Sequence, residues 1–287
     1  MEWLKKLSAA IVFIDWSLVM DFSYDEAAQI ACCSKYYFQR MFSYVAGISL
    51  SEYIRRRKMT QAAFELQTTD NKVIDVATKY GYNSPTSFNR AFQKIHGISP
   101  IIAKSMGCTL NAYPPITFSI KVTGGKAMSY RIEEKEAMRI VGVRTALMED
   151  MESNLKIVPD FWKKTLLQNE FRTICELSNT SPNGVLGITV YENPSNIFYY
   201  IAAATDKDAI NGMYEYEIPA STWVVFENDG FFKEDVQSVF RRFLTEWLPF
   251  SGYEYAELPD IEVYPICKGQ VTSGHSEVWI AVKSKGE

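Results

Sequence analysis

Polar and cationic side chains gather at one point of the stretch Val73–Pro100, where a helical pattern restarts after a turn. Gly81 ends a short apolar run, Ser84 can cap a second helix, and Pro85 suits that helix's first position. The leading end of the second helix carries Thr86, Ser87, Asn89 and Arg90. Arg can donate two hydrogen bonds to guanine, and Asn can pair with adenine. Two short helices joined by a tight turn, the second with a cationic leading end, predict a helix-turn-helix that reads DNA.

The stretch has a twin fifty residues earlier, with nine identities in the gap-free window 25–49. Ser34 is the expected N-cap of the twin's second helix, and Tyr36, Gln39 and Arg40 project from its leading end. A duplicated helical hairpin that only builds a core is the alternative. The matched phenylalanines fit that alternative, but a core has no need of the matched Arg40 and Arg90.

This doubled pattern resembles the DNA-binding domain of AraC/XylS-type transcription regulators over roughly the first 105 residues. The second unit carries most of the resemblance, in GY, S-x-x-S-F-x-R-x-F and G-I-S-P, while Gln93 replaces the family's usual Lys. The resemblance implies an all-α double helix-turn-helix whose first recognition helix reads bases through Tyr36, Gln39 and Arg40. The alternative for Arg40 and Arg90 is a phosphate contact, which positions a protein without specifying sequence.

Further helices complete the expected helical domain, which we place at residues 1–107. Residues 1–20 predict a supporting helix, 25–31 and 34–45 the first motif, and 50–66 a connecting helix capped by Ser51. A rigid connection would hold the two reading helices about 34 Å apart, one turn of B-DNA, so that one chain uses successive major grooves. The basic run 55–58 is either a solvated helix face or a phosphate contact.

Composition separates a basic part from an acidic part. Residues 1–107 hold 13 Lys and Arg against 9 Asp and Glu, a net charge of +4, and the remainder holds 17 against 25, a net charge of −8. A basic half that meets phosphate and an acidic half that does not fit this division. The hydrophobic content of 47% excludes wholesale disorder, and no apolar run approaches the roughly 20 residues of a membrane span.

The five cysteines have no CxxC spacing and predict reduced thiols, with neither a disulfide framework nor a zinc site. The adjacent Cys32 and Cys33 leave a redox switch open. We read no signal peptide and expect a cytoplasmic protein without a membrane partner.

The sequence pattern changes from helical to β-prone after a predicted linker at 108–125, which holds Pro114–Pro115 and Gly124–Gly125. The second predicted domain, residues 126–287, alternates β-prone runs with two helical patterns at about 160–177 and 236–247. The expected strands are Met138–Ala146, Val185–Tyr191, Ile197–Ala204, Trp223–Glu227, Ile261–Tyr264 and Val278–Val282. Strand, helix and strands, taken twice, predict an α+β domain of two similar halves.

This second half resembles a GyrI-like effector-binding domain over about residues 128–283. The resemblance lies in WVVFENDG at 223–230, WLP at 247–249, SGYE at 251–254 and DIEVY at 260–264. It implies an antiparallel sheet and a carboxylate, Glu262, inside an aromatic-lined cavity that a cationic ligand could neutralise. The candidate walls are Trp162, Tyr191, Trp223, Phe226 and Trp247. The alternatives are plain core for each aromatic, and an outward-facing or structurally paired acid for Glu262.

The domain order resembles the Rob-type branch of the AraC family and implies a ligand-responsive transcription regulator. We expect an activator whose partners are double-stranded promoter DNA, RNA polymerase and a small amphipathic or cationic aromatic effector, with no metal and no cofactor. Two alternatives stay open: a ligand-independent docking domain, and a pocket in which Glu262 hydrolyses a small molecule. Otherwise the sequence holds few catalytic signals, since it lacks GxSxG, HExxH and a phosphate-binding glycine loop, and we expect His96 at the surface and His275 in a loop.

Overall fold

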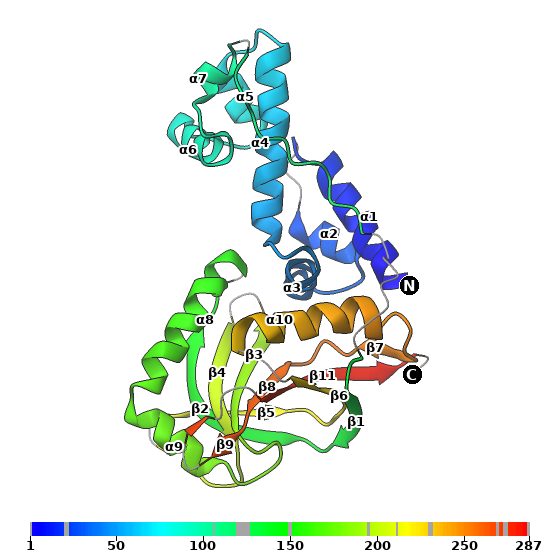
Figure 1. The fold of residues 1–287 in the computed structure, drawn as a ribbon, viewed down its shortest axis with the longest axis vertical. Coiled ribbons are helices and arrows are strands. Elements are labelled where there is room, and N and C mark those ends of the chain that lie inside the picture. The colour runs from blue at the N-terminus through cyan, green and yellow to red at the C-terminus, as the bar shows by residue number, and fades with distance from the viewer. Residues whose placement is uncertain are drawn as a thin grey trace. The chain divides into compact units, whose positions relative to one another are not determined.

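The chain divides into two compact units, Met1–Ile120 and Lys121–Glu287. The computed structural model describes residues 2–19, 23–105, 107–118, 127–148, 151–193, 196–210, 212–228, 232–267, 270–271 and 275–285 (Figure 1). The first unit is helical and the second is built on one antiparallel sheet. Both predicted architectures are confirmed.

The first unit arranges two helix-turn-helix motifs about one long helix. Its helices are α1 (Glu2–Trp16), α2 (Tyr24–Ile30), α3 (Lys35–Ala46), α4 (Leu50–Thr68), α5 (Val73–Lys79), α6 (Pro85–His96) and α7 (Pro100–Ala103). The N-terminal half of α4 gives Tyr53 and Ile54 to a first core with α1–α3, and its C-terminal half gives Met59 and Leu66 to a second core with α5–α7. One straight element therefore runs through both cores.

Serine caps start the helices at repeated positions. Ser34, Ser84 and Ser99 each accept a backbone N–H from the helix that follows, as expected of an N-cap. The predicted cap of α4, Ser51, is wrong: Ser49 accepts the Glu52 N–H at 3.2 Å, and Ser51 lies inside the helix. The repeat explains this, because Ser49 occupies the position of Ser99, fifty residues on.

The two motifs differ by one residue in their turns. Ala28 O accepts Cys33 N–H in the first turn, as Ala77 O accepts Tyr82 N–H in the second, which is an offset of 49. The offset is 50 for the capping serines that follow. The gap-free repeat therefore holds from Ser34 onward, and the first motif's turn is one residue shorter.

The second unit carries a nine-stranded sheet with helices between its strands. The strands are β1 (Tyr130–Lys135), β2 (Met138–Ala146), β3 (Val185–Asn193), β4 (Asn196–Ala204), β5 (Tyr214–Ile218), β6 (Ser221–Asn228), β7 (Tyr253–Tyr255), β8 (Ile261–Tyr264) and β11 (Ser276–Ser284). The helices are α8 (Met151–Leu166), α9 (Asn169–Leu177), α10 (Phe232–Arg242) and the π-helix η1 (Phe243–Trp247). A separate pair of short strands joins β9 (Ile266–Cys267) to β10 (Gln270–Val271).

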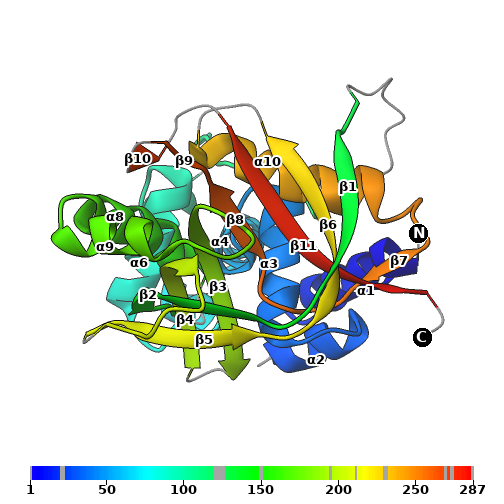
Figure 2. The ribbon, with the colours of Figure 1, turned by 90° about the horizontal axis from the view of Figure 1, so that it is seen from below.

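The strand order β1-β6-β11-β8-β3-β4-β2-β5 is symmetric about the β8–β3 pair. In one half β2, α8 with α9, β3 and β4 follow one another along the chain, and in the other β6, α10 with η1, β8 and β11 do so. Each half also lends its leading strand to the other, because β1 pairs with β6 and β5 pairs with β2. β1 and β5 thus form the two rims of the twisted sheet (Figure 2).

The structure corrects the predicted helices of this unit. The helix predicted at 160–177 is two helices, because the chain breaks at Leu167 and Gln168, and α8 begins already at Met151. The helix predicted at 236–247 begins at Phe232 and ends in a π-helical turn. Part of the predicted linker, residues 119–125, lies outside the described residues, as do Asp229 and Gly230 of the WVVFENDG segment.

Candidate functional site

The leading end of α6 presents the polar side chains that the sequence singled out. Thr86, Ser87 and Arg90 are exposed and Asn89 is half-buried, whereas Phe88 is fully buried in the second core. The Ser84 hydroxyl accepts the Ser87 N–H at 3.5 Å, so the first turn is fixed by its cap. This end of α6 can approach the major groove of DNA with its hydrogen-bonding groups forward.

The corresponding residues of α3 lie on the helix face that points away from its core. With 100° per residue, Tyr36 and Arg40 are turned at least about 140° from the Phe38–Phe42 side. The Arg40 Nε donates to the Tyr44 hydroxyl at 3.0 Å, and its guanidinium lies 5.5 Å from that ring's centroid. Tyr36, Gln39 and Arg40 are buried.

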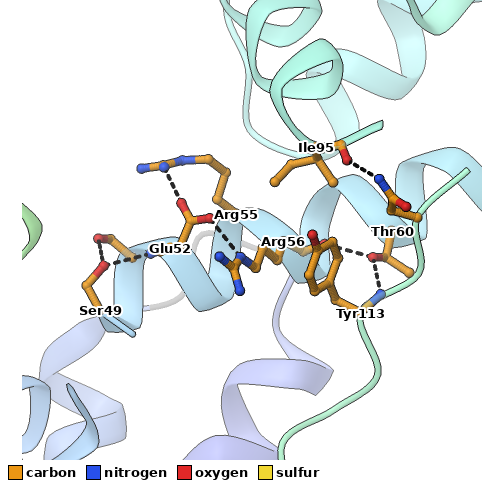
Figure 3. Close-up of polar contacts among 9 residues, drawn as sticks. Ser49, Glu52, Arg55, Arg56, Thr60, Ile95 and Tyr113 are labelled. Atoms are coloured by element: carbon orange, nitrogen blue, oxygen red, sulfur yellow. Dashed lines mark hydrogen bonds and ion pairs between the residues drawn. The ribbon is translucent and has the colours of Figure 1, made fainter. Parts of the chain in front are cut away.

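The basic run on α4 is engaged within the first unit. Glu52 accepts hydrogen bonds from both Arg55 and Arg56 (Figure 3). Arg57 pairs with Asp15 of α1 at 2.6 Å, with only 7% of its side chain exposed, and Lys58 donates to a backbone oxygen. The sequence left a solvated helix face and a phosphate contact open for this run, and the structure instead gives all four cations partners within the first unit.

His96 is buried, so its predicted surface position is wrong. Its Nδ1 accepts the backbone N–H of Asn111 at 3.2 Å, which leaves the proton on Nε2, 3.1 Å from the Met59 carbonyl oxygen. Burial lowers the pKa of the imidazole, and the Met59 contact opposes that shift. The ring is a neutral link between α4, α6 and the segment that follows α7.

Glu262 of β8 lies in the middle of the sheet of the second unit, within the β8–β3 pair. Its Oε2 accepts hydrogen bonds from Tyr264 (2.8 Å) and Tyr199 (3.1 Å). The Trp162 indole of α8 donates to the Tyr199 hydroxyl at 2.9 Å, and its ring meets the Tyr264 ring edge-on at 5.2 Å. Burial and the nearby carboxylate raise the pKa of Tyr264 well above its usual value. The result is a carboxylate held by two neutral phenols and flanked by three aromatic rings.

A glycine makes room for this arrangement. Gly187 pairs with Glu262 across the β3–β8 ladder. A Cβ at position 187 would lie 2.3 Å from the Tyr199 hydroxyl and 2.9 Å from Glu262 Oε2. The absent side chain is therefore what allows the phenol and the carboxylate to meet.

The predicted aromatic walls separate into three groups. Trp162 contacts the Glu262 site, and Tyr191 lies on the same face of β3 as Gly187, four residues along. Phe226 and Trp247 pack on each other at 6.0 Å in an aromatic cluster with Phe243. Phe226 shares the cross-strand row of Glu262 two strands away, through Val278.

Trp223 does not line the Glu262 site, and this assignment is corrected. Its side chain is fully buried in the core on the opposite face of the sheet, 6.3 Å from the Trp279 ring. Alternation along β6 explains the error, because positions 223 and 226 differ by an odd number and point to opposite faces. Tyr199 and Tyr264 were missed. The i, i+2 spacing of Glu262 and Tyr264 on one strand was the available signal for the latter.

No helix among the residues that the structure describes has the length and apolar character to cross a membrane. Nor do three or more His, Cys, Asp or Glu side chains of the described ranges gather in a way that could hold a metal ion.

Two family models match the chain, one for each unit. "Helix-turn-helix domain" covers residues 27–103, and "Integron-associated effector binding protein" covers residues 131–282. The transcriptional activator AarP of Providencia stuartii is 44% identical over 94 residues, which are 33% of this chain and 70% of AarP. The right origin-binding protein of Escherichia coli K12 is 33% identical over 92 residues, which are 32% of each chain.

Among solved structures, that of SAV2435 bound to tetraphenylphosphonium is similar, with 20% identity and a TM-score of 0.48 over 54% of this chain and 94% of that one. From the two family models and the curated relatives, the chain belongs to the AraC-type helix-turn-helix transcription regulators and carries an effector-binding domain of the integron-associated family C-terminal to its DNA-binding unit.

Proposed function

We propose that this regulator activates transcription by seating α3 and α6 in successive major grooves of a promoter and by contacting RNA polymerase. The observation that carries the DNA half is the exposed, serine-capped leading end of α6 with Arg90. Arg40 of α3, which corresponds to Arg90 in the repeat, reads the second half-site. α4 is 19 residues long, about 28 Å at 1.5 Å per residue, which is close to one 34 Å turn of B-DNA. The protein then binds chromosomal DNA in the cytoplasm.

The assignment of bases to these residues is tested by substitution on a site selected from random DNA by the full-length protein. Arg90→Ala should weaken binding to that site by about 1–3 kcal/mol and relax base preference at one position. Arg40→Ala should do the same in the other half-site. Equal losses on the selected site and on random DNA would contradict base reading and assign the arginines to phosphate.

The effector half of the proposal rests on the Glu262 carboxylate. A partly buried carboxylate among aromatic rings recognises a cation with delocalised charge, since the charge pairs with Oε2 and the rings add cation–π attraction. The net charge of −8 beyond residue 107 favours the same sign of ligand. The effector is therefore a small aromatic cation.

Two ligands of nearly equal shape and opposite charge show whether binding depends on the charge of the ligand or on its shape. Tetraphenylphosphonium should bind the full-length protein in calorimetry and tetraphenylborate should not. Glu262→Gln, which keeps the hydrogen-bond acceptor and removes the charge, should weaken phosphonium binding about tenfold or more. Equal binding by the variant would refute the carboxylate's role.

A gel shift on the selected DNA, with and without tetraphenylphosphonium, asks whether the site regulates. A ligand changes DNA affinity only through a difference in its affinity for two states of the protein. No change in DNA affinity, together with no change in transcription in a reconstituted assay, would favour a docking domain over an effector switch. Recovery of a chemically altered ester of a similar cation would favour a hydrolase.

A further inference from the structure

The segment that follows α7 is packed along the helical unit, although the sequence predicted a linker there. Residues 110–118, which we term the strap, form neither helix nor strand. The strap and α4 are the two segments that contribute side chains to both helical cores: Leu110 and Tyr113 pack on the second core, and Ile116 and Phe118 on the first.

The first part of the strap is tied to the second helix-turn-helix. The Asn111 side chain donates to the Ile95 carbonyl oxygen at 2.7 Å, and its backbone N–H donates to His96 Nδ1. Two residues later the Tyr113 N–H donates to the Thr60 hydroxyl of α4 at 3.0 Å. These bonds give the backbone N–H groups of Asn111 and Tyr113 acceptors in a segment that is neither helix nor strand.

The last part of the strap is tied to the first helix-turn-helix. The Arg57 guanidinium donates to the Tyr113 carbonyl oxygen at 2.7 Å while its Nε holds Asp15 of α1. The Tyr53 hydroxyl accepts the Ile116 N–H at 3.3 Å and donates to the same Asp15 at 2.6 Å. The Phe118 ring then meets Phe42 of α3 edge-on at 6.3 Å.

The strap gives the two motifs a second connection, parallel to α4. A long helix curves gently between its ends, so a second connection further restricts how the two motifs are oriented. The strap is bonded to the helical unit at both ends and in its middle. It therefore holds the two motifs together with α4, and we term α4 and the strap the frame. The Arg56 guanidinium, 5.0 Å from the Tyr113 ring centroid, adds a contact at the midpoint (Figure 3). Two of the four cations of α4, Arg56 and Arg57, therefore contact the strap.

We propose that the strap sets the spacing and relative orientation of α3 and α6, and that Asn111, Tyr113 and Thr60 are specificity-determining residues for the distance between the two half-sites on DNA. This inference rests on the proposed reading of DNA by both helices. It makes the strap residues determinants of which promoters are bound, although none of them contacts a base.

Docking of the strap is measured directly in the full-length protein by hydrogen–deuterium exchange. The amides of Tyr113 and Ile116 have hydrogen-bond acceptors and should exchange at least about tenfold more slowly than an unstructured segment. Thr60→Val removes the acceptor of the Tyr113 amide and should speed exchange there, while exchange in α6 stays as in the parent protein. Exchange at unstructured rates in the parent protein would overturn the inference.

The effect on specificity is measured with spacer variants of the site that the full-length protein selects from random DNA. Insertion of two base pairs between the half-sites should weaken the parent protein at least about tenfold. With Asn111→Ala/Tyr113→Ala, and more mildly with Thr60→Val, the same insertion should cost threefold or less. Thr117→Ala, an exposed position on the same strap, is the matched control and should behave as the parent protein does.

The outcomes separate the inference from the function on which it rests. If the parent protein selects two half-sites and every variant keeps its full spacing dependence, the strap has no such role. If the parent protein selects a single half-site, two-groove reading fails and the spacing role fails with it. The double variant could lose its spacing dependence by unfolding. Thr60→Val removes a single hydroxyl, so a loss of spacing dependence in this variant is not caused by unfolding.

Discussion

Substitution of Gly187 by Ala is expected to disrupt the Glu262 site from a position that has no functional group of its own. The added Cβ would lie 2.3 Å from the Tyr199 hydroxyl, whereas an ordinary contact is 3.4 Å or more. The hydroxyl must therefore retreat by about 1.1 Å, which follows from the difference between these distances. Tyr199 cannot swing away freely, because its side chain is buried and Trp162 donates to its hydroxyl.

The cost follows from two sources. Forcing an extra methyl group into packed surroundings costs about 1–3 kcal/mol. Losing the Tyr199 hydrogen bond to the Glu262 carboxylate, now 3.1 Å long, adds to it, because hydrogen bonds to charged groups contribute about 1.5–3 kcal/mol. We expect a net loss of about 2.5–6 kcal/mol, and a melting temperature of the second unit lower by roughly 5–24 °C.

Calorimetry of the full-length protein measures both consequences. The unfolding transition of the second unit should move to lower temperature, and tetraphenylphosphonium should bind about tenfold more weakly. Gly252→Ala is the matched control, because its Cβ would meet no atom within 4 Å. If Gly187→Ala melts and binds like Gly252→Ala, the Tyr199–Glu262 contact does not organise the site, and the reasoning is refuted.

Three other perturbations test the helical unit by urea unfolding of the full-length protein followed by circular dichroism. Arg57→Ala should cost about 3–5 kcal/mol, since it leaves the largely buried Asp15 without its cation and with the Tyr53 hydroxyl alone, and Arg55→Ala should cost less than about 1 kcal/mol; equal effects would contradict the structural role of Arg57. His96 binds a proton more weakly in the folded state because its pKa is lowered, so its contribution to stability is complete above the unfolded pKa of about 6.5 and falls below it, and His96→Gln should flatten that slope. Cys32→Gly should stabilise by about 0.5–1 kcal/mol, because Cys32 has φ 55 at the turn position where the second motif has Gly81, and a lower stability would show that the thiol outweighs the strain.

The helical unit was largely predictable because its signals are local. Serine caps, Pro85 and Gly81 act within a few residues of where they stand, so the helices begin and end near the expected positions. The turn of the first motif was not, because Cys32 takes a left-handed conformation that sequence patterns assign to glycine. His96 was misplaced for a different reason. Its ring is bonded to Met59 of α4 and to Asn111 after α7, and no pattern within α6 specifies either contact.

The Glu262 site was only half predictable because its residues meet through strand register. Trp162 and Glu262 could be singled out, but Tyr199 reaches the carboxylate from β4, across β3. No local pattern specifies which residue of one strand stands opposite which residue of another two strands away. The face of the sheet on which Trp223 lies could have been predicted from alternation along β6, but only once the pairing of β6 and β8 with β11 is known.

The distribution of charge bears on how this regulator reaches specificity. The first unit carries a net charge of only +4 over residues 1–107, and several of its cations are held by its own acids: Arg55 and Arg56 by Glu52, Arg57 by Asp15, and Lys79 by Glu65. Cations that remain in such pairs release fewer counterions from DNA, so the sequence-independent part of binding is small. In the proposed mode of reading, discrimination among promoters would depend on base contacts at α3 and α6 and on the fixed distance between them. Each half-site alone would then bind weakly, and a rigid connection between α3 and α6 would allow the second contact to form without a further loss of conformational freedom.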